Sequence, residues 1–224
     1  MNKKYIITSS LITCIILYFV EQVLGVNYAV KTLSKVVLFI LIPYLYIKIV
    51  KKSTLREELN FRKLDKKHLK LGFLFGISSF LIILAAYFLV GQYINFDSIA
   101  SELQSKSKIT PANFIFVGLY ITFGNSFLEE FFFRGFIFLS LYELKSKRLA
   151  YVYSSVLFGL YHIAIFKTWF NVGLIGLSLF GLIAVGFIFN WLDTKSENFI
   201  NSWIVHILAD SAIILIGCRM FNIF

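Results

Sequence analysis

The sequence has few charged residues for its length. Asp, Glu, Lys and Arg make up 15% of the 224 residues, whereas soluble domains carry about 25%. Hydrophobic residues make up 58%, which is more than one aqueous core of this size can bury. This composition excludes an ordinary soluble domain and predicts a protein whose solvent is largely lipid.

Cysteine and proline are also scarce. The two cysteines, Cys14 and Cys218, lie in apolar runs. Their spacing suits neither a disulfide framework nor a metal site, so both are predicted to be buried as small apolar residues. Of the two prolines, Pro43 is expected to kink a span and Pro111 to stand where a helix begins.

Several well-known catalytic motifs are missing. The sequence contains no His-Glu-x-x-His zinc motif, no Gly-x-Ser-x-Gly nucleophile turn and no glycine-rich phosphate loop. Zincin, α/β-hydrolase and P-loop chemistries are therefore excluded.

Long apolar runs are what the sequence has instead. A run of roughly 20 apolar residues crosses about 30 Å of hydrocarbon, and no run alternates as a barrel strand would. Since lipid offers no hydrogen-bond partners to the backbone, we predict an all-α, polytopic transmembrane helix bundle forming a single membrane-embedded domain over 1–224. The first run lacks a small-x-small cleavage site and is expected to be a retained span. The predicted spans, about seven, are 5–25, 33–50, 71–91, 112–142, 149–166, 172–192 and 200–221.

Basic residues indicate the orientation of the chain. They give a net charge of +10 and cluster beside the apolar runs, which favours lipid headgroups over nucleic acid as their partner. By the positive-inside rule, we predict a cytoplasmic N-terminus in a multi-pass protein. The abundance of Ile, Lys and Phe indicates an AT-rich genome, and hence a bacterial cell membrane.

The segment 51–70 is the richest in basic residues. It opens with Thr54-x-x-Glu57, the pattern of a capping box, and we expect a basic amphipathic segment lying on the cytoplasmic headgroups. The alternative is a loop that only sets the topology. Its basic residues are Lys51, Lys52, Arg56, Arg62, Lys63, Lys66, Lys67 and Lys70.

A few charged or titratable residues lie deep inside the predicted spans. A charge at the centre of a span costs several kcal/mol, and such residues usually face the bundle interior and serve function. In this sequence they come from three different spans, which a single stray ion pair would not require. They are Glu129, Glu130, Arg134, His162, His206 and Asp210.

Helical spacing relates these residues to one another. Glu130 and Arg134 are four residues apart with the acid first, which favours an ion pair. Glu129 is rotated by about 100° from Glu130 and so is expected to remain free for another role. Glu129 and His162 each lie about 20 Å from the inner end of their span, at 1.5 Å per residue. With His206 entering from the same side, we predict one shared cavity open to the cytoplasm.

A purely structural interpretation stands beside the functional one. Glu130 with Arg134 can be an ion pair that only braces the helices, and a single buried histidine is more often a satisfied core residue than a catalytic one. Asp210, four residues after His206, can simply hold the tautomer of that imidazole. It is the combination at matching depth that favours a site.

At these residues the sequence resembles the CPBP family of intramembrane proteases, also called the Abi or CAAX-protease family. The motifs are Glu129-Glu130-x-x-x-Arg134, Phe158-x-x-x-His162 and His206-x-x-x-Asp210, in order, on successive late spans. The resemblance covers roughly 112–215, the predicted catalytic helices. Prenyl-protein proteases of the family have asparagine where this chain has Asp210.

The resemblance implies hydrolysis of peptide bonds in membrane-associated peptides or proteins. It implies that Glu129 activates water, that His162 holds this water, and that His206 and Asp210 stabilise the oxyanion. Glu130 and Arg134 would then support the site. No cofactor is favoured; the alternative is a divalent metal such as zinc held by Glu129, His162 and His206, with an open position for water.

Other functions can use the same residues. Non-enzymatic bacteriocin self-immunity, by binding to a membrane partner, is the alternative that the family suggests. A proton- or ion-coupled transporter is disfavoured, because the chain is short, lacks inverted repeats and clusters its polar groups. Prenylated substrates are not expected in bacteria, so the resemblance implies peptide pheromones or bacteriocins as the substrates.

Overall fold

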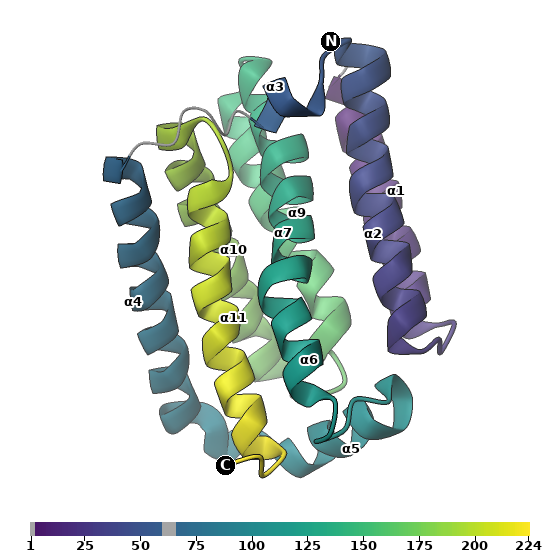
Figure 1. Ribbon diagram of the computed structural model, residues 1–224, viewed down its shortest axis with the longest axis vertical. Helices are drawn as coiled ribbons and strands as arrows, with labels where there is room; N and C mark the ends of the chain where they lie inside the picture. Colours follow the sequence, from purple (N-terminus) through teal and green to yellow (C-terminus); the bar gives the residue numbers. More distant parts are fainter. Residues whose placement is uncertain (1–2, 60–65) are drawn as a thin grey trace.

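The computed structural model describes residues 3–59 and 66–224, and these are helical wherever they form regular structure; no strand occurs among them. Figure 1 shows the helices running up and down a single bundle. The predicted all-α bundle is confirmed. The long single helices are α1 (Lys3–Gln22), α2 (Tyr28–Leu45), α4 (Lys66–Val90), α9 (Lys147–Phe166), α10 (Val172–Ser196) and α11 (Ile200–Met220).

Six helices of the described chain are long and apolar enough to cross a membrane. They correspond to six of the predicted spans, and α2 is extended to Lys51 by the π-helical segment η1 (Tyr46–Lys51), which begins shortly after Pro43. The protein is therefore a multi-pass membrane protein.

The remaining predicted span, 112–142, is not one regular α-helix. It is a run of short α and π segments, so the predicted helical run is present but its hydrogen-bond pattern changes along its length. Pro111 lies in the turn before this run rather than within its first helix. A π-helix forms i→i+5 hydrogen bonds and is often found at functional sites. The segments are α6 (Phe114–Leu119), η4 (Tyr120–Asn125), α7 (Ser126–Glu130), η5 (Phe131–Leu139) and α8 (Ser140–Glu143).

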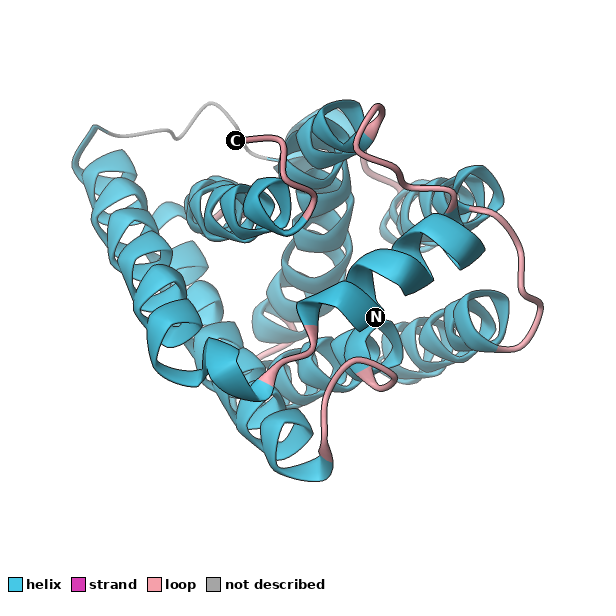
Figure 2. Cartoon of the chain, turned by 90° about the horizontal axis from the view of Figure 1, so that it is seen from below, coloured by secondary structure: helices cyan, strands magenta, loops and turns pink. Residues whose placement is uncertain are grey.

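The two chain ends lie at opposite ends of the bundle (Figure 1). The N-terminus and α3 (Leu55–Leu59) are at the upper end, and the C-terminus and α5 (Phe96–Ser107) at the lower end. Seen from below, α5 crosses the end of the bundle (Figure 2). This arrangement suits an odd number of crossings, with the composite run from Phe114 to Glu143 as one of them.

The distribution of side chains is the reverse of a soluble protein's. Large apolar residues face outward, with Phe88 75% and Leu89 71% exposed, whereas Arg134 and Glu130 are 0% exposed. An apolar surface around a charged interior is stable only where lipid is the solvent.

Helix α4 packs along α11, which carries His206. Gly72 and Gly76 face α11, and a Cβ atom on Gly72 would lie 2.8 Å from Asn201 Oδ1 and 3.3 Å from Asn201 Cα. A Cβ on Gly76 would overlap Leu208. Small residues four apart let two helix backbones approach closely in lipid, so this glycine pair fixes the position of α11.

The basic segment 51–70 is only partly described, because residues 60–65 lie outside the described ranges. The predicted capping box is present at the start of α3: Thr54 N–H donates to Glu57 Oε2 at 3.0 Å, and Glu57 N–H donates to Thr54 Oγ1 at 3.3 Å. The bond from the Thr54 backbone, helped by the Ser53 hydroxyl, lowers the pKa of Glu57. Lys51 pairs with Glu58 of α3 and with Glu143 of α8 at 2.7 Å, which ties α3 to the bundle.

Candidate active site

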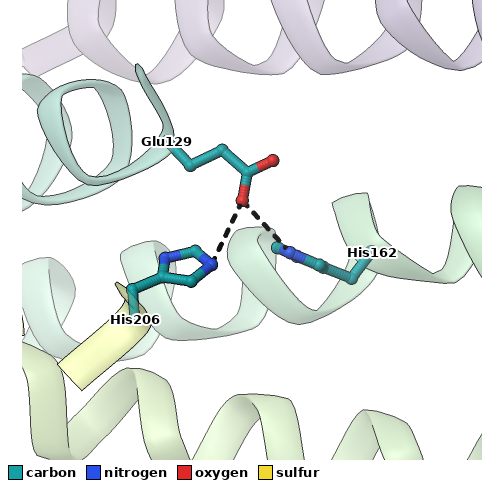
Figure 3. Close-up of side chains that lie close together, drawn as sticks. All are labelled: Glu129, His162 and His206. Atoms are coloured by element: carbon teal, nitrogen blue, oxygen red, sulfur yellow. Dashed lines mark ion pairs between the residues drawn. The ribbon is translucent and has the colours of Figure 1, made fainter. Parts of the chain in front are cut away.

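The deep polar residues meet in the interior of the bundle. Segment α7 provides Glu129 and Glu130, α9 provides His162, and α11 provides His206. Glu129 Oε2 lies 3.3 Å from His162 Nε2 and 3.8 Å from His206 Nε2. Figure 3 shows the Glu129 carboxylate pointing toward both imidazole rings. The structure thus brings together three residues that are far apart in the sequence.

The two oxygens of Glu129 have different surroundings. Oε1 accepts hydrogen bonds from Lys35 Nζ at 3.1 Å and from Asn125 Nδ2 at 2.9 Å, and the Tyr161 hydroxyl lies 3.5 Å away. Oε2 is buried and has no hydrogen-bond donor among the described residues. One oxygen is therefore anchored, and the other faces the imidazoles.

Both histidines are held by their Nδ1 atoms. His162 Nδ1 lies 2.8 Å from the Phe158 carbonyl oxygen, and His206 Nδ1 lies 2.8 Å from Glu130 Oε1. A carbonyl oxygen can only accept, so His162 must carry a proton on Nδ1. Its Nε2 is then an acceptor when the ring is neutral, and it faces Glu129 Oε2, a second acceptor. A hydrogen-bond donor or a cation within reach of both atoms would satisfy them.

Arg134 and Glu130 form the ion pair that their spacing predicts. Arg134 Nη1 donates to Glu130 Oε1 at 3.2 Å. The guanidinium carbon lies 3.9 Å from the ring centroid of Phe158 and 4.8 Å from that of Phe189, so two aromatic faces stabilise the buried cation. Since Glu130 also binds His206, the pair fixes one side of the site.

Asp210 lies at the margin of the site. Its Oδ2 is 3.7 Å from His206 Nε2, too far for a hydrogen bond, and is buried without a partner in the described part of the chain. The same face of α11 therefore carries both residues, as their spacing predicts.

The site is nearly closed, in contrast to the predicted cavity open to the cytoplasm. The side chain of Glu129 is 1% exposed, that of His206 9% and that of His162 14%. Aromatic rings enclose it: the centroid of Phe158 lies 4.3 Å from that of His162, and that of Phe189 lies 6.0 Å from that of His206. Sequence depth could place the residues together but gave no information on this aromatic enclosure.

A divalent metal fits the same three residues. One ligand atom of each of Glu129, His162 and His206 lies within 4.8 Å of the other two. Tetrahedral zinc, with bonds of about 2.1 Å, needs ligand atoms about 3.4 Å apart. Metal-binding histidines usually donate their second N–H to a carbonyl or carboxylate, as both do here. The ammonium of Lys35, bound to the same carboxylate, acts against a cation by repulsion.

Sequence reasoning missed Lys35, Asn125 and Tyr161. Lys35 lies near the start of its predicted span, 33–50, where a lysine is ordinarily an interface residue. Asn125 stands four residues before Glu129, and this helical spacing could have identified it. No local signal points to Tyr161, whose contact with Glu129 arises from the packing of α9 against α7.

Comparison with known proteins identifies the segment that carries most of this site. Residues 111–212 match the family model described as Rce1-like, type II CAAX prenyl endopeptidase. Neither the curated proteins nor the solved structures include a significant match. The matched segment contains all the predicted site residues and excludes Lys35.

Proposed function

Residues 111–212 belong to the Rce1-like family of type II CAAX prenyl endopeptidases, and from this premise we propose that the protein hydrolyses peptide bonds of membrane-associated peptides with a water molecule activated by Glu129. The family is described as one of endopeptidases, and the membrane spans of this chain support a site within the bilayer. The catalytic residues and the substrate are the proposal.

One observation carries the proposal most strongly: Glu129 Oε2 and His162 Nε2, 3.3 Å apart, converge with no donor between them. A water molecule at ordinary hydrogen-bond distance from both would donate one hydrogen to each acceptor. Its lone pairs then point away from these two acceptors, and the proposal places the substrate carbonyl on that side. This is the arrangement that general-base catalysis requires.

The remaining residues have complementary roles. As the water oxygen attacks the carbonyl carbon, Glu129 takes the proton and then delivers it to the departing amine nitrogen, so that the C–N bond breaks. His206 carries protons on both nitrogens in this scheme: Nδ1–H donates to Glu130, and Nε2–H stabilises the oxyanion. Asp210 acts through His206 by balancing its charge.

A metal would use the same side chains. If zinc is bound, Glu129, His162 and His206 hold it, and it supplies an acidified water and polarises the carbonyl. The chain's own contacts, namely Nδ1 of each imidazole and Oε1 of Glu129, would orient the ligands in the same way.

The substrate is proposed to be a peptide that reaches the site from the bilayer or its inner surface. The bundle exposes apolar side chains to lipid, and the catalytic groups lie inside it rather than at a loop surface. Since the site is nearly closed, a helix or aromatic ring must move aside before a peptide can enter.

The test is a peptidase assay on the purified protein in proteoliposomes. The probes are internally quenched apolar peptides, with and without an S-farnesyl cysteine in a C-terminal CAAX sequence, each assayed with and without a chelator. Glu129→Gln should abolish cleavage, because an amide cannot accept the proton. Glu21→Gln is the matched control, since Glu21 also pairs with a lysine of α2 at 3.0 Å.

The outcomes are distinct. Loss of cleavage in Glu129→Gln with a folded protein and normal activity in Glu21→Gln supports the proposal. Full activity in Glu129→Gln overturns it. Absence of cleavage of every probe, with protection against a bacteriocin that survives Glu129→Ala and His206→Ala together, would favour the immunity function instead.

A further inference from the structure

We infer that Lys35 is a positioning residue for Glu129: its ammonium anchors one carboxylate oxygen so that the other faces the imidazoles. The inference rests on the proposed function, in which Glu129 activates water. Lys35 belongs to α2, far outside the family-matched segment, so the family does not supply it.

The contacts of Lys35 converge on one point. Its Nζ donates to Asn125 Oδ1 at 2.7 Å and to Glu129 Oε1 at 3.1 Å. Nζ also lies 5.3 Å from the centroid of the Tyr161 ring, within the range of a cation–π interaction. Asn125 Nδ2 in turn donates to the same Glu129 oxygen at 2.9 Å. Lysine, amide and carboxylate form a closed triangle of hydrogen bonds.

A lysine in this place needs a reason. Its side chain is only 16% exposed and lies in a membrane span, where an unpaired ammonium costs several kcal/mol. The carboxylate it meets is 1% exposed. The pair satisfies both charges, since Glu130, the neighbouring acid, already has Arg134 as its cation. Each of the two adjacent glutamates therefore has a separate fixed positive charge.

The asymmetry of the carboxylate gives the pair its role. A carboxylate rotates readily about its last torsion, and without an anchor the orientation of the group relative to His162 would vary. Two donors on Oε1 hold the group with Oε2 toward Nε2 of both histidines. Misplacement of a catalytic group by about 1 Å can lower the rate by about 100-fold.

The chain offers a matched control one helical turn away. Lys31 lies on the same helix, its side chain is 15% exposed, and it pairs with Glu21 of α1 at 3.0 Å. Removing this lysine deletes an ion pair whose lysine is as buried as Lys35 and whose acid, Glu21, is 32% exposed, without touching Glu129. Any general effect of losing a lysine from α2 will appear in both variants.

The experiment compares Lys35→Met with Lys31→Met, using the best quenched peptide from the proteoliposome assay. We expect Lys35→Met to lower kcat by about 10- to 100-fold with KM unchanged, and Lys35→Arg to recover much of the loss because it restores the charge. Lys31→Met should keep the kcat of the parent protein, with a melting temperature at least as high as that of Lys35→Met, because Glu21 is 32% exposed and Glu129 only 1%. If Lys35→Met is not recovered folded, kcat and KM are measured for Lys35→Gln instead.

Failure of this inference can be told from failure of the proposed function. If Glu129→Gln is inactive while Lys35→Met and Lys35→Gln keep the parental kcat, Lys35 has no positioning role and the protease proposal stands. A rise in KM at constant kcat would also overturn the inference, since it would place Lys35 in substrate binding. If Glu129→Gln is fully active, the proposed function itself fails.

Discussion

Removing Arg134 should destabilise the protein strongly, and the structure indicates by how much. Arg134 and Glu130 are both 0% exposed, and Arg134 Nη1 donates to Glu130 Oε1 at 3.2 Å. In Arg134→Met, Glu130 remains as a buried carboxylate without its cation. Removing one partner of a buried ion pair costs about 3–5 kcal/mol. The stacking of Arg134 on Phe158 at 3.9 Å is lost as well, so we expect a loss of stability in the upper part of this range.

The double variant Glu130→Gln/Arg134→Met separates the charge from the packing. It removes both charges, and glutamine still presents an oxygen to His206 Nδ1. Replacing a whole buried pair by neutral residues is often close to neutral in stability. The double variant should therefore be more stable than Arg134→Met alone, by about 2 kcal/mol or more.

The free energy of unfolding is measured by SDS titration in mixed micelles, followed by tryptophan fluorescence. Arg148→Met is the control, because Arg148 is exposed at the start of α9 and its loss should change stability by less than about 0.5 kcal/mol. The reasoning is refuted if Arg134→Met is as stable as the parent protein, or if the double variant is no more stable than the single one.

Three further predictions concern the glycine pair Gly72 and Gly76, the carboxylate of Asp210 and the metal. Gly72→Ala should lower the melting temperature and kcat, because its Cβ would lie 3.3 Å from Asn201 Cα on α11. Gly181→Ala, whose Cβ would have nothing within 4 Å, should raise the melting temperature slightly. Equal effects of the two substitutions would contradict the role of the glycine pair. Asp210→Asn should retain kcat within about tenfold, since Asp210 acts through His206 and makes no hydrogen bond to it; a loss as complete as that of Glu129→Gln would assign it direct proton chemistry. Treatment with 1,10-phenanthroline should leave cleavage intact, since Lys35 already places a positive charge beside Glu129. A loss that zinc reverses would show that the metal is required.

The sequence was sufficient to predict the membrane spans and the ion pair between residues four apart. Apolar length alone located six helices within a few residues of their bounds, since lipid leaves the backbone no alternative. The Glu130–Arg134 pair followed from a spacing of four residues. The catalytic roles of Glu129, His162, His206 and Asp210 stay a prediction, as do the cytoplasmic N-terminus and the headgroup contact of 51–70.

The fourth predicted span, 112–142, shows where sequence reasoning fails. Nothing in its composition distinguishes η4 and η5 from α-helix, because i→i+5 bonding is decided by packing against neighbouring helices rather than by local propensity. The rotation of about 100° between Glu129 and Glu130 still applied, since both lie in the short α7. The four-residue spacing of Glu130 and Arg134 also held, although Arg134 lies in η5.

Lys35 was not predicted for a different reason, which concerns how the helices pack around the site. Position along a span gives the depth of a Cα atom, but a lysine side chain reaches several ångströms further and its partner depends on which helices are neighbours. Helix α2 packs against α7 and η5, and α4 packs along α11. The helices predicted to be catalytic, 112–215, therefore take the charge beside Glu129 from α2 and the position of His206 from α4. In lipid, where helix faces attract one another only weakly, such buried polar contacts and close glycine seams are what can fix a catalytic geometry, so the first hundred residues belong to the site as much as to its anchoring.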